Sequence, residues 1–330
     1  PTASLSDKEV ETLFGIINDL KSKGITILYI SHKMNEIFQM CDRATVLRDG
    51  KYIKTIEMAK TTRDEVIQAM VGRDISLFAK RTMPCQKQGD VPVLTVEHLG
   101  SDLFHNISFD LYAGEILGFF GLVGAGRTEV MRAIFGADPY TEGKVCLHQK
   151  EIHCKSPHEA IEMGIALISE NRKEEGILPN FDNKDNISLA SLKKYMSGFV
   201  INDDKKKKNA LDKGSQVGLK PNDPAFMTVS LSGGNAQKVI LARWMSTDAA
   251  VMIFDEPTKG IDIGAKADIY LLMEKMAQQG VAIIMVSSEL TEVMGMSDRI
   301  IVMRDGMITG ELEQEEFSEQ NILNYTVEGN

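Results

Sequence analysis

The sequence has 330 residues, 43% hydrophobic and 25% charged, a globular composition long enough for two ordinary domains. Its formal net charge of -10 argues against a nucleic-acid partner, because phosphate contacts need clustered Lys and Arg. The four cysteines show no C-x-x-C spacing and no apolar run approaches the roughly 18 residues of a membrane span, so we expect neither a metal–sulfur site nor a bilayer-crossing helix.

The first elements along the chain belong to an internal repeat. The sequence opens with PTASLSDKEV, and its first dipeptide returns at Pro257-Thr258. An offset of 256 aligns residues 1–50 with residues 257–306 without a gap, so that GITILYISHKMNEIFQMCDRATVLRDG falls on GVAIIMVSSELTEVMGMSDRIIVMRDG. The apolar stripe of the first helix repeats as well. Two copies of one unit are therefore predicted.

The two copies differ in what precedes them. A long segment ending at Glu256 comes before the second copy, and a helix followed by one strand and a short tail cannot form an independent core. We expect residues 1–78 to be the C-terminal part of a first domain, and the sequence to be a fragment of a longer tandem protein with an Asp-Glu pair before Pro1. The polar stretch at 79–91 predicts a linker. The second domain would then occupy 92–330.

A phosphate-binding loop is predicted in GEILGFFGLVGAGRTEVMRAIFG, an apolar strand, a glycine-rich turn and an amphipathic helix. The turn fits G-x-x-x-x-G-K-[ST] from Gly121 to Thr128, with Arg127 at the lysine position. The glycines, which include Gly124 and Gly126, would let backbone N–H groups point at phosphates. The Thr128 hydroxyl is placed for Mg²⁺. A purely structural turn would give the same pattern, and arginine is a planar fork rather than a compact charge.

A second anion site is predicted in LSGGNAQKVILARWM, where Ser232, Gly233 and Gly234 open a helix. A serine and bare backbone N–H groups at a helix N-terminus suit a phosphate. Within one domain this site duplicates the first. We therefore expect it to serve a phosphate that another domain holds.

A carboxylate pair ends the next apolar run, AAVMIFDEP. Asp255, at the end of a buried strand, would hold Mg²⁺, and Glu256 would polarise an attacking water as the catalytic base. A helix-capping role is the alternative for such a pair. Its position downstream of a phosphate-binding loop favours the catalytic reading.

The order of these motifs, followed by GID at 260–262 and a strand with a switch residue, resembles an ATP-binding cassette (ABC) ATPase. GLVGAGRTE, SENRKEEGI, LSGGNAQKV, DEPTKGIDIGAK and VSSEL are similar to the second cassette of the tandem ATPase subunit of bacterial monosaccharide importers, and PTASLSDKE and YISHKMNEIF to its first. The resemblance covers the whole chain. It implies an α/β fold: a RecA-like P-loop core, an antiparallel β subdomain and a helical subdomain at about 178–245.

The same resemblance implies that each ATP, with Mg²⁺, lies between the P-loop of one cassette and the LSGG segment of the other, with Asp262 among the nucleotide-binding residues. Three residues depart from the family pattern: Arg127, Glu170 in place of glutamine, and Ser288 in place of the catalytic switch histidine. The first copy keeps His32 at the position matching Ser288. These departures imply that the second pocket binds ATP but hydrolyses it poorly, while LSGGN completes the competent site of the first cassette. An ordinary strand-end hydroxyl and a loop histidine remain alternatives for Ser288 and His32.

The partners that the resemblance implies are integral-membrane permease subunits and, indirectly, a sugar-binding protein, at the cytoplasmic face of the cell membrane. The loop after Glu170 would meet a permease helix, unless it is an ordinary charged loop. Two other functions stay open. One is a non-catalytic ATP-dependent clamp, suggested by Arg127 and Ser288; the other is a soluble tandem-cassette protein acting on ribosomes or DNA, which the acidic balance disfavours.

Overall fold

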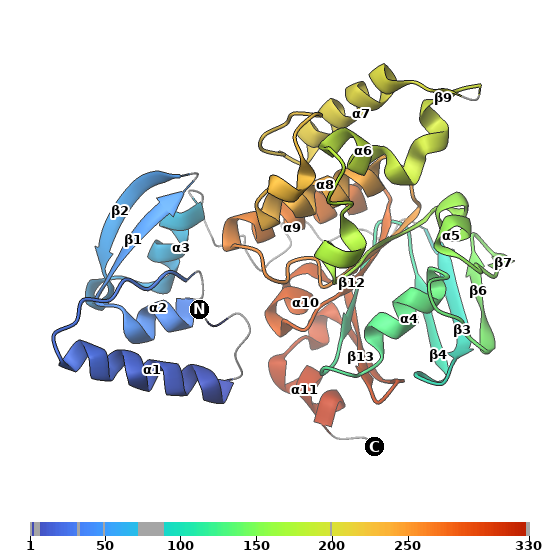
Figure 1. Ribbon diagram of the computed structural model, residues 1–330. Coiled ribbons are helices and arrows are strands. Elements are labelled where there is room, and N and C mark those ends of the chain that lie inside the picture. Colours follow the sequence, from blue (N-terminus) through green and yellow to red (C-terminus); the bar gives the residue numbers. More distant parts are fainter. Residues whose placement is uncertain are drawn as a thin grey trace. The chain divides into compact units, whose positions relative to one another are not determined.

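The computed structural model describes Thr2 and residues 7–31, 34–48, 50–71, 89–198 and 200–327 (Figure 1). The chain divides into two compact units. The smaller unit comprises Pro1–Ser76 with Gly260–Lys266, and the larger comprises Leu77–Lys259 with Ala267–Asn330. Residues 79–88 of the predicted linker lie outside the described part of the chain.

The smaller unit combines helices with one hairpin. Its elements are α1 (Asp7–Ser22), α2 (Met34–Met40), β1 (Arg43–Arg48), β2 (Lys51–Glu57), a 3-10 helix at Met58–Lys60, and α3 (Arg63–Val71). β1 and β2 pair antiparallel. A small core of Met34, Ile37, Met58 and Val66 lies between the helices and the hairpin.

Each of these elements recurs farther along the chain at the offset of 256. The second set is α9 (Ile263–Gln278), α10 (Leu290–Met296), β13 (Arg299–Arg304), β14 (Met307–Glu313), a 3-10 helix at Gln314–Glu316, and α11 (Glu319–Val327). The irregularity in the first hairpin, a register shift after Val46, recurs after Val302. The repeat predicted from sequence is therefore confirmed in the structure.

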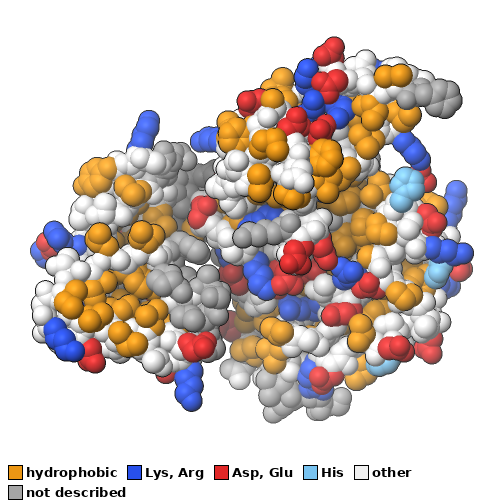
Figure 2. All heavy atoms as spheres, viewed as in Figure 1, with side chains coloured by type: hydrophobic (Ala, Val, Ile, Leu, Met, Phe, Trp, Pro, Cys, Tyr) orange, Lys and Arg blue, Asp and Glu red, His pale blue; other side chains and the backbone are white. Residues whose placement is uncertain are grey.

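One segment of the repeat differs between its two copies. In the second copy it forms β12 (Ala282–Val286), a fully buried strand. In the first copy residues 25–30 form no regular element, and Leu28 and Ile30 are 93% and 89% exposed. Figure 2 shows hydrophobic side chains on the visible face of this unit.

Two sheets form the frame of the larger unit. The first has the order β14-β13-β5-β12-β11-β8 and is parallel apart from the β13–β14 pair. Its remaining strands are β5 (Ile116–Phe120), β8 (Ile165–Ile168) and β11 (Val251–Asp255). Each of these three is buried along its whole length, as expected for parallel strands covered on both faces. The helices α4 (Arg127–Ile134), α5 (Pro157–Met163), α10 and α11 pack against this sheet.

The second sheet is antiparallel, with the order β4-β3-β6-β7. Its strands are β3 (Leu94–Gly100), β4 (Ile107–Leu111), β6 (Glu142–Leu147) and β7 (Lys150–Ile152). Together with the parallel sheet, it confirms the predicted α/β core with an antiparallel β subdomain.

A helical region gathers at one end of the larger unit, where Figure 1 shows α6, α7 and α8 together. It contains α6 (Asn183–Ser188), a 3-10 helix at Leu189–Tyr195, the short strands β9 (Met196–Ser197) and β10 (Val200–Ile201), α7 (Asp203–Gln216), a 3-10 turn at Thr228–Ser230, and α8 (Gly233–Met245). No helix of the described residues combines the length and hydropathy needed to span a bilayer.

The charged run DDKKKK at 203–208 has a composition that, taken alone, suggests a solvated loop. It forms the first turns of α7 instead. The Asn202 side chain caps the helix by accepting from the Lys205 N–H, and the acidic Asp203 lies in the positive first turn. Lys184 and Lys207 both pair with Asp203.

Candidate nucleotide-binding site

The glycine-rich turn joins the buried strand β5 to helix α4. A Cβ atom added at Gly121 would lie 2.4 Å from the carbonyl oxygen of Met303, so only glycine fits there. Gly124 and Gly126 have φ angles of +85° and +91°, in the left-handed region that favours glycine. The turn is therefore set by close packing at one position and by backbone conformation at two others.

The N-terminus of α4 has unused hydrogen-bonding capacity. Its N-cap is Gly126, which has no side chain to accept from the first N–H groups of the helix. Val123, at the tip of the turn, is 96% exposed. Backbone donors and the positive end of the helix dipole thus face an accessible loop, as an anion site requires.

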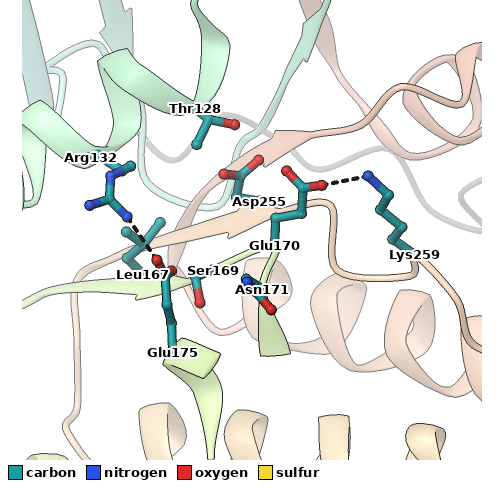
Figure 3. A pocket seen from close by; sticks show the side chains of 9 residues that line it. All are labelled: Thr128, Arg132, Leu167, Ser169, Glu170, Asn171, Glu175, Asp255 and Lys259. Carbon is teal, nitrogen blue, oxygen red and sulfur yellow. Dashed lines mark hydrogen bonds and ion pairs between the residues drawn. The ribbon is translucent and has the colours of Figure 1, made fainter. Parts of the chain in front are cut away.

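Asp255 ends strand β11 beside this helix. It lines the same cavity as Thr128 (Figure 3), and its Oδ1 is buried without a partner among the described residues. Burial raises the pKa of Asp255 to about 7, and the nearby charges of Glu170 and Glu256 act in the same direction. A buried carboxylate with one unpartnered oxygen beside a hydroxyl fits a hard cation such as Mg²⁺.

The protein ligands alone do not complete such a metal site. Among the described residues, no three His, Cys, Asp or Glu side chains gather around one point. Mg²⁺ commonly takes only one or two carboxylates and completes its shell with phosphate and water. Thr128 and Asp255 therefore fit a cation whose remaining ligands are phosphate oxygens and water.

Glu256 follows Asp255 and adopts a φ of +47°, which is uncommon for a residue other than glycine. Its backbone N–H donates to the Val286 carbonyl, which ties it to β12. The guanidinium of Arg127 lies 3.9 Å from its carboxylate. Burial raises the pKa of Glu256, while hydrogen bonds from the hydroxyl and the backbone N–H of Ser288, together with the charge of Arg127, lower it.

The Arg127 side chain contacts the backbone carbonyl of Ser287 and the carboxylate of Glu256. Its Nη1 donates to the carbonyl oxygen of Ser287 at 2.8 Å, and the residue is only 8% exposed. The structure therefore brings together three of the predicted residues: Arg127, Glu256 and Ser288.

A cavity of about 450 Å³ opens beside Thr128 and Asp255. Figure 3 shows the side chains that line it: Thr128, Arg132, Leu167, Ser169, Glu170, Asn171, Glu175, Asp255 and Lys259. Glu170, the predicted nucleotide-site residue, forms an ion pair with Lys259. In the view of Figure 3 this pair and the Arg132–Glu175 pair lie on opposite sides of the cavity.

The predicted second anion site is the N-terminus of α8. Ser232 is its N-cap, and its hydroxyl accepts from the backbone N–H of Asn235. A Cβ at Gly233 would lie 3.2 Å from Nη2 of Arg172, so this guanidinium lies over the start of the helix. Ser232, Gly233 and Gly234 do not line the cavity beside Thr128, which is consistent with separate sites.

Two predicted residues do not contribute to this geometry. His32 lies outside the described residues. Asp262 belongs to the smaller unit, where its carboxylate accepts from the N–H of Ala265 in the first turn of α9.

Lys259 is a cavity residue that the sequence reasoning missed. A signal was available in the repeat, because the offset of 256 places Lys259 on Ala3. The lysine is thus present only in the second copy of the repeat, which follows the loop that contains Arg127.

The chain is similar to known proteins of one family. The ABC transporter family matches residues 104–259. The chain is 43% identical, over all of its length, to the ribose import ATP-binding protein RbsA of Halalkalibacterium halodurans, and 46% identical, over 98% of its length, to the arabinose import ATP-binding protein AraG of Mannheimia succiniciproducens. Residues 104–259 belong to the ABC transporter family.

The chain spans only part of those two import ATP-binding proteins, 66% and 64% of their lengths. A solved ATP-binding cassette, a dimer bound to ADP and Pi, superposes with a TM-score of 0.59 at 20% identity. That match covers 68% of this chain and all of the solved chain. It confirms the ABC cassette fold.

Proposed function

We propose that the larger unit binds ATP with Mg²⁺, and that the protein to which this chain corresponds hydrolyses ATP to drive monosaccharide import. The observation that carries the proposal is the buried, unpartnered oxygen of Asp255, which lines the same cavity as Thr128 at the start of α4 (Figure 3). Thr128 and Asp255 would hold Mg²⁺, which neutralises phosphate charge when bound. The backbone N–H groups from Gly124 to Thr128 would bind the phosphates.

We further propose that this site hydrolyses ATP poorly. Glu256 is the candidate general base, yet its carboxylate is bound by Ser288 and faces Arg127. A serine hydroxyl does not take up a proton near neutral pH as an imidazole does. The carboxylate of Glu256 is therefore engaged by neighbouring side chains, and Ser288 stands where a histidine would relay a proton.

The exposed start of α8 would serve a phosphate bound to another cassette. Ser232 and Gly233 are both exposed, and Arg172 adds positive charge beside them. In this proposal LSGGN completes the competent site of the first cassette, to which residues 1–78 and His32 belong. The names of the relatives support sugar import, and permease subunits at the cytoplasmic face of the membrane are the proposed partners.

Calorimetry and phosphate release test the nucleotide part on this chain. We expect MgATP to bind, Thr128→Val to weaken that binding, and turnover to be negligible. Absence of MgATP binding would overturn the nucleotide proposal. Substantial Mg²⁺-dependent turnover that Glu256→Gln abolishes would overturn poor hydrolysis at this site.

The assignment of LSGGN needs the full-length subunit reconstituted with its permease. We expect Gly234→Asp to lower sugar-stimulated turnover by about 10² to 10³, the cost of losing one well-placed donor to a developing charge. Arg127→Ala should have a smaller effect. The reverse ranking would make the larger unit's own pocket the working one, and MgATP binding without any turnover would favour the non-catalytic clamp.

A further inference from the structure

The cations near the nucleotide cavity are arranged unlike the pattern that the P-loop sequence predicts. In that pattern the residue before Thr128 reaches the phosphates. Here Arg127 is only 8% exposed and does not line the cavity. Its guanidinium donates to Ser287 and lies 3.9 Å from the carboxylate of Glu256.

Breaking these contacts would be costly. Glu256 is 9% exposed, so an Arg127 that turned toward phosphate would leave a buried carboxylate facing a void. Removing one partner of a buried charge pair is strongly destabilising because the other charge stays uncompensated. Arg127 is thus better placed to neutralise Glu256 than to bind a ligand.

Two cationic side chains line the cavity, among the residues described. Arg132 is held by both oxygens of Asp138, at 2.6 and 3.2 Å, and by Glu175 at 3.2 Å. Its donors are therefore largely committed. Lys259 has a side chain that is 60% exposed and pairs with Glu170.

The backbone beneath Lys259 is well anchored. Its N–H donates to the carbonyl of Glu256, and the preceding Thr258 is buried with its hydroxyl bonded to Glu292 at 2.7 Å. A fixed backbone with an exposed side chain places an ammonium reliably while letting it change partner. An ammonium has three donors, so it can bind a phosphate oxygen and keep a hydrogen bond to Glu170.

The charge of the cavity calls for such a group. Asp255, Glu170 and Glu256 all lie close enough to raise the pKa of Lys259, after the larger effect of its hydrogen bond to Glu170. A triphosphate entering beside three carboxylates needs more positive charge than one divalent cation supplies. Lys259 is the more exposed of the two cavity cations, and its ammonium can donate to a phosphate while it stays paired with Glu170.

We infer that Lys259 is the phosphate-binding cation of this site, and that Arg127 is the internal counter-ion of Glu256. The inference rests on the proposed function and adds a ligand-contacting residue to it. Lys259 lies on the carboxylate side of the cavity, with Asp255 and Glu170, so its contact is with the terminal phosphate. ATP should depend on it more than ADP.

Calorimetric titration of this chain with MgATP and MgADP provides the test. We expect Lys259→Met to weaken MgATP binding about tenfold, the usual value of one charge-assisted hydrogen bond, and MgADP binding less than about twofold. Lys259→Arg should restore most of the loss. Arg127→Met should change MgATP binding less than about threefold, and Lys275→Met, on the exposed surface of α9, should change nothing.

A double variant separates phosphate contact from simple neutralisation of Glu170. In a Glu170→Gln background Lys259→Met should still weaken MgATP binding about tenfold. If the effect disappears there, Lys259 acts only on Glu170 and the inference is wrong. A tenfold loss from Arg127→Met with none from Lys259→Met also refutes it, whereas an unaltered chain that binds no MgATP refutes the proposed function itself.

Discussion

The guanidinium of Arg243, in helix α8, donates to Asn186 twice: Nε to its backbone carbonyl at 2.6 Å and Nη2 to its side-chain oxygen at 2.9 Å. Both residues are buried. The same Asn186 oxygen accepts from the N–H of Leu178, in the loop that follows the cavity. Arg243 and Asn186 therefore join the LSGGN helix to the segment after Glu170, which forms a π-helical turn at Arg172–Gly176 before Leu178.

We predict that Asn186→Ala lowers the free energy of unfolding by about 3 kcal/mol, because it removes the side-chain oxygen that accepts from Nη2 of the buried Arg243 and from the N–H of Leu178. Burial already lowers the pKa of Arg243 to about 10, which shows how poorly solvated that charge is. Urea denaturation measures the change. Gln216→Ala, on the exposed face of α7, is the control and should stay within about 0.5 kcal/mol; an equal loss in both variants would contradict the prediction.

Asp255→Asn should stabilise the metal-free chain while abolishing its Mg²⁺ response. Burial raises the pKa of Asp255 from 3.8 to about 7, so stability is greatest below 3.8, falls as pH rises from 3.8 through about 7, and is lowest once the carboxylate is ionised in the folded chain. A neutral amide removes that cost, and we expect Tm at pH 8 to rise by about 2–4 °C. Thermal melts with ATP, with and without Mg²⁺, should show a Mg²⁺-dependent increase only in the unaltered chain. A lower Tm for the variant without Mg²⁺ would show that Asp255 has a different structural role.

Gly121→Ala should weaken nucleotide binding because the added Cβ clashes with its neighbours, beyond the backbone strain that replacing a glycine can cause. The added Cβ would meet the Met303 carbonyl at 2.4 Å and Ala125 at 2.9 Å, so the turn must shift. We expect MgATP affinity to fall more than about tenfold and stability by about 1–3 kcal/mol. Gly164→Ala is the matched control: it has a φ of +93° and a nearest contact at 3.7 Å, so it should lose stability through strain alone and keep its affinity.

The exposed segment at 25–30 predicts self-association of this chain. Leu28 and Ile30 present apolar side chains and unpaired backbone, a combination that promotes strand pairing between molecules. Leu28→Thr with Ile30→Thr should shift sedimentation-velocity profiles toward monomer. Leu323→Thr, at an exposed position on α11, should leave the profile unchanged. Unaltered association in the double variant would place the contact elsewhere.

Features that depend on local pattern were predictable from the sequence. The strand, glycine-rich turn and helix around Gly121 follow from a contiguous apolar run and from glycine positions, and the repeat follows from direct alignment. The core fold and the glycine-rich turn of the site could therefore be predicted from the sequence alone.

Features that depend on side-chain direction were not. A motif places Arg127 next to Thr128, but only the packed position of Ser287 shows that the guanidinium turns to a carbonyl instead. The ion-pair partner of Lys259 is Glu170, which lies far away in the sequence. The helix at 203–216 lies within the predicted helical subdomain, but its highly charged start has the composition of a loop; the cap at Asn202 and the acidic first turn are the local signals that favour a helix start.

The two copies of the repeat also indicate which segments adopt the same secondary structure in different surroundings. The helices and the hairpin arise with identical boundaries in both copies, although only the second copy pairs with β5 of the parallel sheet. The segment that becomes β12 takes strand form only between β5 and β11, and its copy at 25–30 does not. We expect hydrogen exchange to report this division: amides of β12 should become protected only when the whole parallel sheet assembles, later than those of the β13–β14 hairpin, because loop closure over long sequence separations slows such pairing.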